Sequence, residues 1–517
     1  MKPKFLTAAV LMACGLLATS GSIHADGLPE LGDAADTALP EPQERALGKR
    51  IMQEIHADRS YIDDAELNAY INGLGNRLIA ASRGTTNDNR RDFEFFLLND
   101  DAINAFALPG GFIGVHSGLL LASSSESELA GVLGHEISHV FQRHLVRGLE
   151  AQKNNSWKTL AALATALIAS RSNSSQSGQV TEAAIVASTA LQYQSQLDYS
   201  REFEREADRL GIQVMQQAGF DPTGMVGFFE RLQKANRHND GKTPGYLRTH
   251  PLTTERIADM QSRVDSMGAE GKRSVPDSLD YRLSVAKLRV LSMGASDAVP
   301  FFRAAIAERT IRRDRADVYG LALALTRMRE FAAAEKELAT IRANTPSPWV
   351  ENLSAEILVG QRKWDEALAR YKSGMRLYPQ HRALLYGYLD TLYLMNQVDA
   401  ALATTNEQLS VIQDDPKLFD YAAKGYELKK RKLAQHRAIG EAYFRRDNLR
   451  GAIDQLEIAV KARDGDFYEI SSAEARLKEF RSAFKSRVLL PGEKREERQA
   501  DRDPPSPRDF AESGHWH

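Results

Sequence analysis

Residues 134–139, Gly-His-Glu-Ile-Ser-His, place two histidines four positions apart with a glutamate directly after the first. On a helix, residues four apart lie on one face, so both imidazoles can approach the same ion. Zinc takes nitrogen ligands at roughly 2.0–2.1 Å in a tetrahedron, and catalytic sites keep one position for water. A glutamate beside that face can act as a general base without being a ligand. The pattern predicts one zinc ion per chain, with His135 and His139 as ligands and Glu136 as the base.

A five-residue match arises by chance in many proteins, so the element that carries it matters. Residues 125–128, Ser-Glu-Ser-Glu, have the form of a capping box and predict that a helix starts there. Apolar residues recur behind this start at helical spacing: Leu129, Val132, Leu133, Ile137, Val140 and Phe141. The two histidines are therefore expected on a buried helix.

A second helix is expected from Ser200 onward, and it carries acidic residues. Glu204 and Asp208 are four apart and share a face, so Glu204 can supply a third, oxygen ligand. Asp208 can accept a hydrogen bond from a ligand histidine and fix its tautomer. Glu202 and Glu206 lie two positions either side of Glu204 and are expected to point to solvent.

The segment Thr249-His250-Pro251 offers a further histidine in a loop, where the proline favours an extended backbone. As a fourth ligand, His250 would displace the water and silence the enzyme until it moved. The alternative is a loop histidine with no metal contact. His116 and His144 are interpreted as structural or surface histidines.

A small sheet is expected before the first of these helices. Residues 93–98 have strand composition, and Pro109-Gly110-Gly111 forms a turn before a short strand. That strand, Phe112, Ile113, Gly114 and Val115, is interpreted as a sheet edge that pairs with an extended peptide substrate. An ordinary core hairpin is the alternative. Between the two halves of the site, residues 157–169 and 183–197 read as helices that form either a lid or a plain hairpin.

Taken together, these residues resemble the M48 family of zinc metallopeptidases over about residues 45–265. The turn at 109–111, the stretch Asn104-Ala105-Phe106-Ala107 and Thr249-His250-Pro251 also match that family. The resemblance implies a zincin-like α+β domain with a small sheet, zinc bound by His135, His139 and Glu204, and Glu136 as the catalytic residue. In that family the histidine matching His250 can be an extra ligand of a resting state.

The first 25 residues read as a signal peptide, because two lysines precede an apolar run, residues 5–18, and small residues end at Ala25. The run is shorter than the roughly 20 residues of a membrane span, so the mature chain is expected to have no span. Cys14, the only cysteine, lies inside it; lipid attachment there is the less favoured reading. Residues 26–44 are interpreted as a flexible lead-in. A formal net charge of -2 argues against nucleic-acid binding.

The second half, residues 280–485, alternates glycine turns with Ala/Leu/Tyr-rich helical stretches. One unit follows the tetratricopeptide pattern: Gly360, Trp364, Ala367, Tyr371, Gly374, Leu377 and Pro379. Pro346 and Pro379 are 33 residues apart, against an expected period of about 34. The chain is therefore expected to be mainly α, with an all-α repeat solenoid that binds partners, or a spacer bundle, after the first domain. Residues 491–517 are interpreted as a disordered tail.

With a signal peptide in front and repeats behind, the chain is similar to periplasmic, repeat-bearing members of the M48 family. That resemblance implies misfolded outer-membrane proteins as substrates, chaperone activity, and docking on the outer-membrane barrel-assembly machinery through the repeats. The rival hypothesis is a repeat-based chaperone or adaptor with a closed, rarely active zinc site.

Overall fold

The computed structural model describes residues 39–82, 92–151, 201–238, 245–268, 274–308 and 314–490. Five predicted segments lie wholly or partly outside the described residues: the signal peptide with Cys14, residues 26–38 of the lead-in, the helices at 157–169 and 183–197, and the tail 491–517. Within the described residues the chain is mainly helical with one three-stranded sheet, so the predicted fold class is confirmed.

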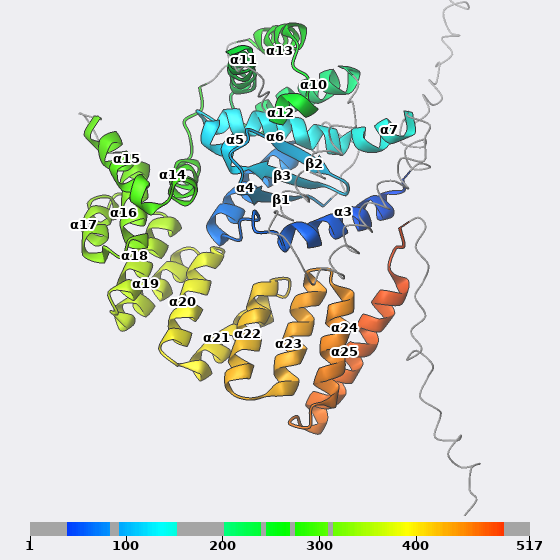
Figure 1. Ribbon diagram of the computed structural model, residues 1–517, viewed down its shortest axis with the longest axis vertical. Coiled ribbons are helices and arrows are strands. Elements are labelled where there is room, and N and C mark those ends of the chain that lie inside the picture. The colour runs from blue at the N-terminus through cyan, green and yellow to red at the C-terminus, as the bar shows by residue number, and fades with distance from the viewer. Residues whose placement is uncertain are drawn as a thin grey trace, which may run out of the picture.

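The first region consists of the sheet and the helices around it (Figure 1). Its elements are α3 (Glu41–His56), α4 (Ala65–Ser82), β1 (Glu94–Leu98), β2 (Ala105–Leu108), β3 (Phe112–His116), α5 (Ser117–Ala122), α6 (Glu126–Phe141), α7 (His144–Ala151), α10 (Arg201–Gln217), α11 (Thr223–His238), α12 (Gly245–Thr249) and α13 (Thr254–Ser266). Helix α3 starts inside the stretch interpreted as lead-in.

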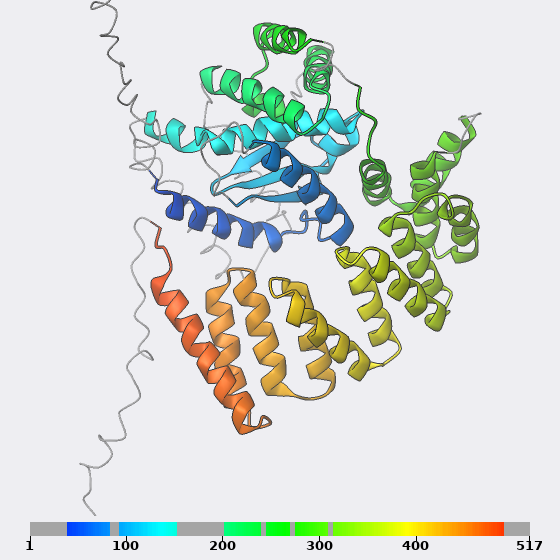
Figure 2. The ribbon, with the colours of Figure 1, turned by 180° about the vertical axis from the view of Figure 1, so that it is seen from behind.

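The two faces of the sheet belong to different cores, because successive strand residues point to opposite sides. Phe95, Leu97 and Val115 join the large core built with α4 and α6. Phe96 and Phe112 face the other way and pack with residues of α3. Figure 2 shows α4 lying across the sheet, with α3 below it. Helices α4 and α6 therefore pack on one face of the sheet and α3 on the other.

The expectation that Phe112, Ile113, Gly114 and Val115 form a sheet edge is wrong. The strand order is β1-β3-β2, so β3 lies in the centre, parallel to β1 and antiparallel to β2. All five residues of β3 are buried, and a nearly continuous apolar run is typical of a strand covered on both faces. The core-hairpin alternative holds for β2 and β3, whose turn contains Gly110 and Gly111 at φ 79° and 89°.

The second region is an array of paired helices that curves below the first (Figure 1). Its elements are α14 (Leu279–Met293), α15 (Ala295–Glu308), α16 (Arg315–Arg327), α17 (Phe331–Arg342), α18 (Pro348–Gly360), α19 (Trp364–Leu377), α20 (Arg382–Leu394), α21 (Val398–Val411), α22 (Pro416–Leu428), α23 (Lys432–Arg445), α24 (Leu449–Lys461) and α25 (Phe467–Ser486).

The backbone of the array repeats with the expected period. Arg329, Arg362, Asn396 and Lys430 each have a positive φ, between 56° and 65°, in the tight turn between two paired helices. These turns follow one another after 33, 34 and 34 residues, which is the tetratricopeptide period. The same conformation thus recurs in the turn inside each helix pair, from α16–α17 to α22–α23.

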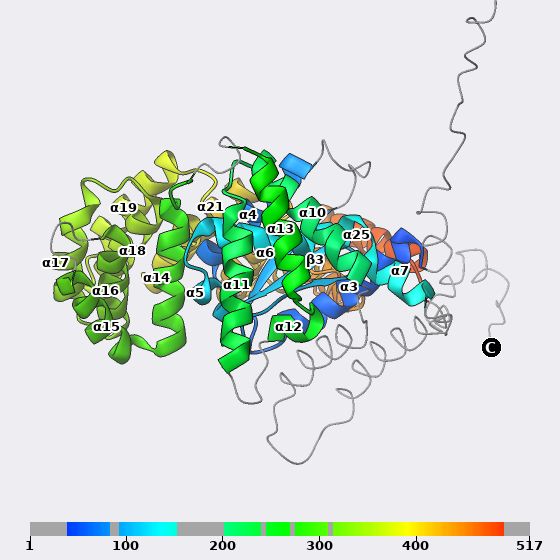
Figure 3. The same ribbon diagram turned by 90° about the horizontal axis from the view of Figure 1, so that it is seen from above.

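Both ends of the array contact the first region. At one end, Lys287 Nζ of α14 lies 2.6 Å from both Asp64 Oδ2 and Glu66 Oε2. At the other end, Lys49 Nζ lies 2.7 Å from Asp447 Oδ1. A cleft of about 760 Å³ opens between these seams, lined by α3, α4 and β1 on one side and by α20, α22 and the turn after α23 on the other. Viewed from above, α14 to α19 lie beside the first region (Figure 3).

No helix within the described ranges combines the length and the apolar character that crossing a bilayer requires.

Candidate metal centre

Helix α6 begins where the capping pattern predicted. Ser125 Oγ accepts a hydrogen bond from Glu128 N at 3.3 Å, while the Glu128 carboxylate accepts from Ser124 N at 2.6 Å and pairs with Arg231. From Glu126 to Val140 the helix is buried along its whole length. The histidines are thus held on a rigid element rather than in a loop.

Helix α10 crosses α6 at a point where both helices carry glycine. A Cβ on Gly134 would lie 3.2 Å from Gly211 O, and a Cβ on Gly211 would lie 3.1 Å from His135 N. Side chains at either position would push the two backbones apart. The close approach lets the Glu204 carboxylate of α10 reach the histidines of α6.

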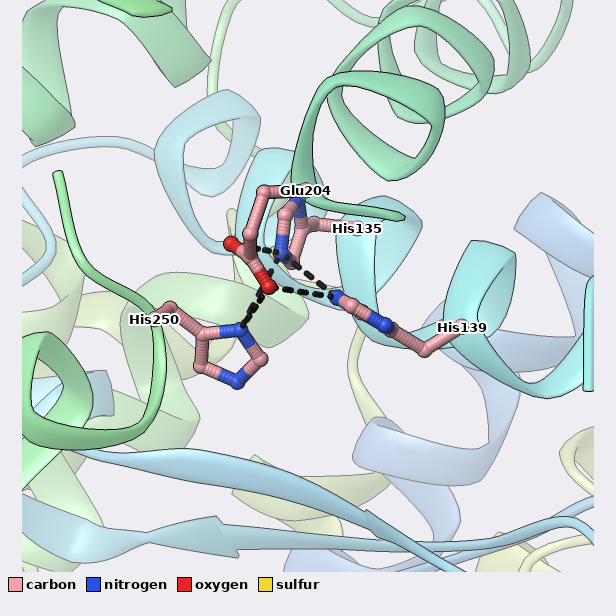
Figure 4. Close-up of side chains that lie close together, drawn as sticks. All are labelled: His135, His139, Glu204 and His250. Carbon is pink, nitrogen blue, oxygen red and sulfur yellow. Dashed lines mark hydrogen bonds and ion pairs between the residues drawn. The ribbon is translucent and has the colours of Figure 1, made fainter. Parts of the chain in front are cut away.

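Four side chains converge at this crossing: His135, His139, Glu204 and His250 (Figure 4). All four are buried, and one ligand atom from each lies within 4.8 Å of the others. His135 Nε2 is 3.0 Å from His139 Nε2 and 3.5 Å from Glu204 Oε2, and His139 Nε2 is 3.4 Å from Glu204 Oε1. His250 Nδ1 lies 3.4 Å from His135 Nε2 and 3.0 Å from Glu204 Oε1.

The spacing of these atoms fits a tetrahedral ion. Ligand atoms placed 2.0–2.1 Å from a tetrahedral centre are about 3.3–3.4 Å apart. Five nitrogen–nitrogen and nitrogen–oxygen contacts in the cluster, measured to either oxygen of Glu204, are 3.0–3.5 Å, and the four ligand atoms all lie within 4.8 Å of one another. Three imidazoles and one carboxylate are also a donor set that suits zinc. The residues present can therefore hold a divalent metal ion.

The far side of His135 is held by a buried acid. His135 Nδ1 lies 3.0 Å from Asp208 Oδ1, a contact that favours a proton on Nδ1, and Nε2 faces the cluster. Arg256 of α13 donates two hydrogen bonds of 2.8 Å to Asp208 and lies 2.7 Å from Glu204 Oε2. Sequence reasoning missed Arg256, which is one of two arginines on α13 and lies on the buried face of that helix with Ile257, Met260 and Val264.

The far side of His139 is held by a histidine. His144 Nδ1 lies 2.9 Å from His139 Nδ1, and His144 Nε2 lies 3.1 Å from Glu206 Oε2. The ring of His144 stacks on Phe203, with centroids 4.5 Å apart. His144 is fully buried, so the structural interpretation holds for it and the surface one does not. The expectation that Glu206 points to solvent is wrong, because His144 and Arg147 hold it; Glu202 is exposed as expected.

His116 is also buried, at the end of β3 and away from the cluster. Its Nδ1 lies 3.6 Å from Asp100 Oδ2, and its ring meets Phe106 edge-on. His116 is therefore a structural residue, as the sequence indicated.

The carboxylate of Glu136 lies beside the cluster rather than in it. Glu136 Oε1 is 3.5 Å from His250 Nε2, and the glutamate is fully buried. Burial raises the pKa of Glu136, although His250 and His135 oppose the rise. Burial also acts on Glu204, but His250, His135 and His139 hold its pKa well below the usual range. Glu204 is thus an anionic ligand candidate, while Glu136 is closer to the pKa that a general base needs.

The N-terminus of α6 is tied to the helix array. Glu126 N donates to Asp277 Oδ1 at 2.7 Å, and the Glu126 carboxylate accepts from Ser278 N at 2.9 Å and from Ser278 Oγ at 2.8 Å. Ser278 is the N-cap of α14. The helix that carries the histidines and the first helix of the array therefore cap each other.

Comparisons with known proteins agree with this geometry. A family model described as peptidase family M48 matches residues 60–264, and one described as tetratricopeptide repeat matches residues 358–424. The beta-barrel assembly-enhancing protease of Escherichia coli (strain K12) is 34% identical over 454 residues, which cover 87% of this chain and 90% of the relative. A putative beta-barrel assembly-enhancing protease of Vibrio cholerae is 37% identical over 62% of this chain and 64% of its own length.

Among solved structures, a tetratricopeptide protein of Thermus thermophilus matches 39% of this chain and 97% of its own chain, at 18% identity and a TM-score of 0.24. The identity to the Escherichia coli relative extends through both regions of the chain. The chain therefore belongs to the M48 family of metallopeptidases and is a metalloendopeptidase that carries tetratricopeptide repeats.

Proposed function

We propose that the chain is an exported zinc endopeptidase in which His135, His139 and Glu204 hold one zinc ion. Asp208 orients His135, and His250 is a fourth ligand of a closed state. The observation that carries this proposal is the convergence of three ligand candidates from two helices, with Glu136 beside them.

When bound, the ion would supply Lewis-acid chemistry, polarising the scissile carbonyl and making water more acidic. Glu136 accepts the proton of the attacking water and passes it to the leaving amine. Its burial keeps bulk water away and brings its pKa nearer to neutral, so it can both take and return a proton. Arg256 pairs with Glu204 Oε2 and so fixes the carboxylate, whose Oε1 lies 3.4 Å from His139 Nε2 and 3.0 Å from His250 Nδ1.

An extended substrate has only one suitable edge of the sheet within the described residues. The outer edge of β1 is occupied, because the Asn72 side chain bonds both N and O of Phe95, and Ile62 N donates to Leu97 O. Strand β2 has a strand partner on one side only and packs against α6. We therefore assign substrate pairing to β2, Ala105–Leu108, in place of β3.

The proposed setting is the periplasm, with outer-membrane barrel proteins as substrates. Three features support it: the signal pattern of residues 1–25, the name and full-length similarity of the Escherichia coli relative, and the repeats. The cleft of about 760 Å³ between the repeats and the peptidase region, with Tyr61 and Tyr386 among charged side chains, offers a place to hold an unfolded client or a partner of the barrel-assembly machinery. Such holding would support chaperone activity without cleavage.

The proposal is tested by metal analysis and one substitution. Purified mature chain should contain one zinc per chain. Glu136→Gln should retain that zinc and lose casein cleavage and self-cleavage, by about 10²-fold or more if Glu136 carries the proton transfer. A zinc-free protein would overturn the ligand assignment, and unchanged cleavage by Glu136→Gln would remove this residue as the base.

The position of His250 favours a second candidate, a chaperone or adaptor whose peptidase site is usually closed. Its imidazole lies among the other ligand candidates and beside Glu136, where water and substrate would have to enter. His250→Ala should raise casein cleavage with zinc content unchanged. Equal cleavage by the variant and the parent would count against a switch.

A further inference from the structure

Among the described residues, His250 contacts Glu204 through Nδ1 and the ring of Tyr246 through its face. We infer that Tyr246 is a positioning residue for the closed state, and that it acts through the face of its ring. This inference rests on the proposed function, because it requires His250 to be the group that closes the site.

Three aromatic rings form a stack behind the ligand cluster. The rings of Tyr246 and His250 are 4.6 Å apart and inclined by 27°, and those of Phe229 and Tyr246 are 5.7 Å apart and inclined by 24°. The exposed fractions of Phe229, Tyr246 and His250 are 0%, 1% and 1%. Phe229 belongs to α11, which packs on α6, so the stack runs from a helix of the core to the ligand candidate that follows α12.

The segment that carries His250 is also anchored through its backbone, and Arg256 Nη1 donates to Pro251 O at 2.7 Å. Helix α12 is only five residues long, and His250 follows it directly, with its N–H donating to Tyr246 O at 2.8 Å. Tyr246 N donates to Ile103 O at 3.1 Å, which ties the start of α12 to the segment before β2. Neither backbone bond depends on the tyrosine side chain. An aliphatic substitution at Tyr246 therefore leaves these backbone bonds in place and removes the ring contacts, which include a tilted contact with His135 at 6.2 Å between centroids.

The hydroxyl of Tyr246 has no partner at hydrogen-bonding geometry among the described residues. It opposes the rise in the pKa of Glu136, but less than His250 and His135 do. Burial raises the pKa of Tyr246 itself well above its usual value, and the negative charges of Glu136 and Glu204 raise it further, so the side chain stays neutral. This hydroxyl makes no hydrogen bond to His250 among the described residues. The planar ring between Phe229 and His250 supplies the contact, as offset aromatic stacking would.

The test compares five purified full-length variants: His250→Ala, Tyr246→Ala, Tyr246→Leu, Tyr246→Phe and Phe228→Leu. Phe228 is the matched control. Like Phe229 it is a buried aromatic residue of α11, with an exposed fraction of 2%, but it lies outside the stack of Phe229, Tyr246 and His250. Two readouts are taken on each variant. One is casein cleavage, and the other is the visible spectrum of the cobalt-substituted protein, which reports the ligands of the ion independently of activity.

Tyr246→Ala should raise cleavage about tenfold, which corresponds to the loss of two stacked contacts, and should shift the cobalt spectrum toward that of His250→Ala. Tyr246→Leu should do the same while filling most of the volume, which covers the case in which the alanine variant unfolds. Tyr246→Phe and Phe228→Leu should stay within about twofold of the parent.

If His250→Ala changes both readouts while Tyr246→Ala and Tyr246→Leu change neither, the inference about Tyr246 is wrong and the proposed role of His250 stands. The inference also fails if Tyr246→Phe behaves like Tyr246→Ala, since the hydroxyl would then be the active group. If His250→Ala leaves both readouts at the parent values, the proposed switch falls and the inference falls with it.

Discussion

The peptidase region and the repeat array are both mostly helical, yet different contacts hold them together. In the array, each helix packs on its neighbours in the chain, and the same turn returns after 33 or 34 residues. In the peptidase region, the metal centre joins three segments, around residues 135, 204 and 250, that are far apart in the chain. Local packing can build a binding surface, whereas a site for chemistry needs charged groups brought together in the interior.

The charges of the two regions illustrate the difference. Arg256 is 4% exposed and contacts the carboxylates of Glu204 and Asp208, which are also buried. Arg446 makes a similar fork with Asp420 in the array, but side-chain exposures there are 36% and 47%. When a buried arginine is removed, its carboxylate partners remain charged in the interior with one fewer counter-charge. When an exposed arginine is removed, water can solvate the carboxylate instead.

The largest effect on stability is expected from removing the buried arginine, Arg256. The exposed arginine, Arg446, serves as the comparison. Arg256→Met should lower the free energy of unfolding by about 3–5 kcal/mol and weaken binding of the proposed zinc ion, because two buried carboxylates lose the guanidinium that contacts both. Arg446→Met should cost less than about 1 kcal/mol. Urea unfolding and zinc competition with a chelator measure both. Equal costs for the two variants would show that the buried and exposed pairs do not differ as argued.

A second effect concerns acid and the seam between the regions. Burial, aided by the positive charge of Lys287, lowers the pKa of His381 to about 4, against its usual 6.5. A lowered histidine pKa favours the neutral folded form, so its stability contribution is complete above pH 6.5 and is lost as the pH falls toward 4. The loss should reach at most about 3 kcal/mol.

His381→Gln should flatten this part of the pH–stability curve, measured by urea unfolding between pH 4 and 7. His436→Gln, on α23 and bonded to Gln455, is the control and should leave the slope as it is. A slope that survives in His381→Gln would assign the acid sensitivity to other groups.

The smallest expected effect is on the coupling between the unfolding transitions of the peptidase region and the repeat array. Ser278→Ala removes a hydrogen bond to Glu126 and the N-cap bond to Tyr281 N, at a cost of about 1–2 kcal/mol. Because the bond to Glu126 crosses the seam, calorimetry should show the peptidase and repeat transitions moving apart. Asn448→Ala removes the N-cap of α24 within the array and should lower only the repeat transition. If the two variants gave the same calorimetric transitions, the contact between Ser278 and Glu126 would not couple the unfolding of the two regions.

Much of the protein could be predicted from the order of its residues. The spacing of His135 and His139, the capping pattern before α6 and the repeat period each depend on neighbours within one turn or one helix pair. Such local rules hold wherever the chain goes. The register of Glu204 and Asp208 on one face of α10 belongs to the same class.

Only the tertiary structure decided the rest. A strand's composition shows that it is buried, but not whether partners lie on one side or both, and so β3 was taken for an edge. Arg256, His144 and Tyr246 gave no periodic signal, because their partners are side chains on other elements. Which groups meet across a helix crossing depends on how closely two backbones approach, and here Gly134 and Gly211 permit that approach. Helix starts, helix faces and the repeat period depend on residues close together in the sequence. Contacts between side chains on different elements depend on how those elements pack in the folded chain.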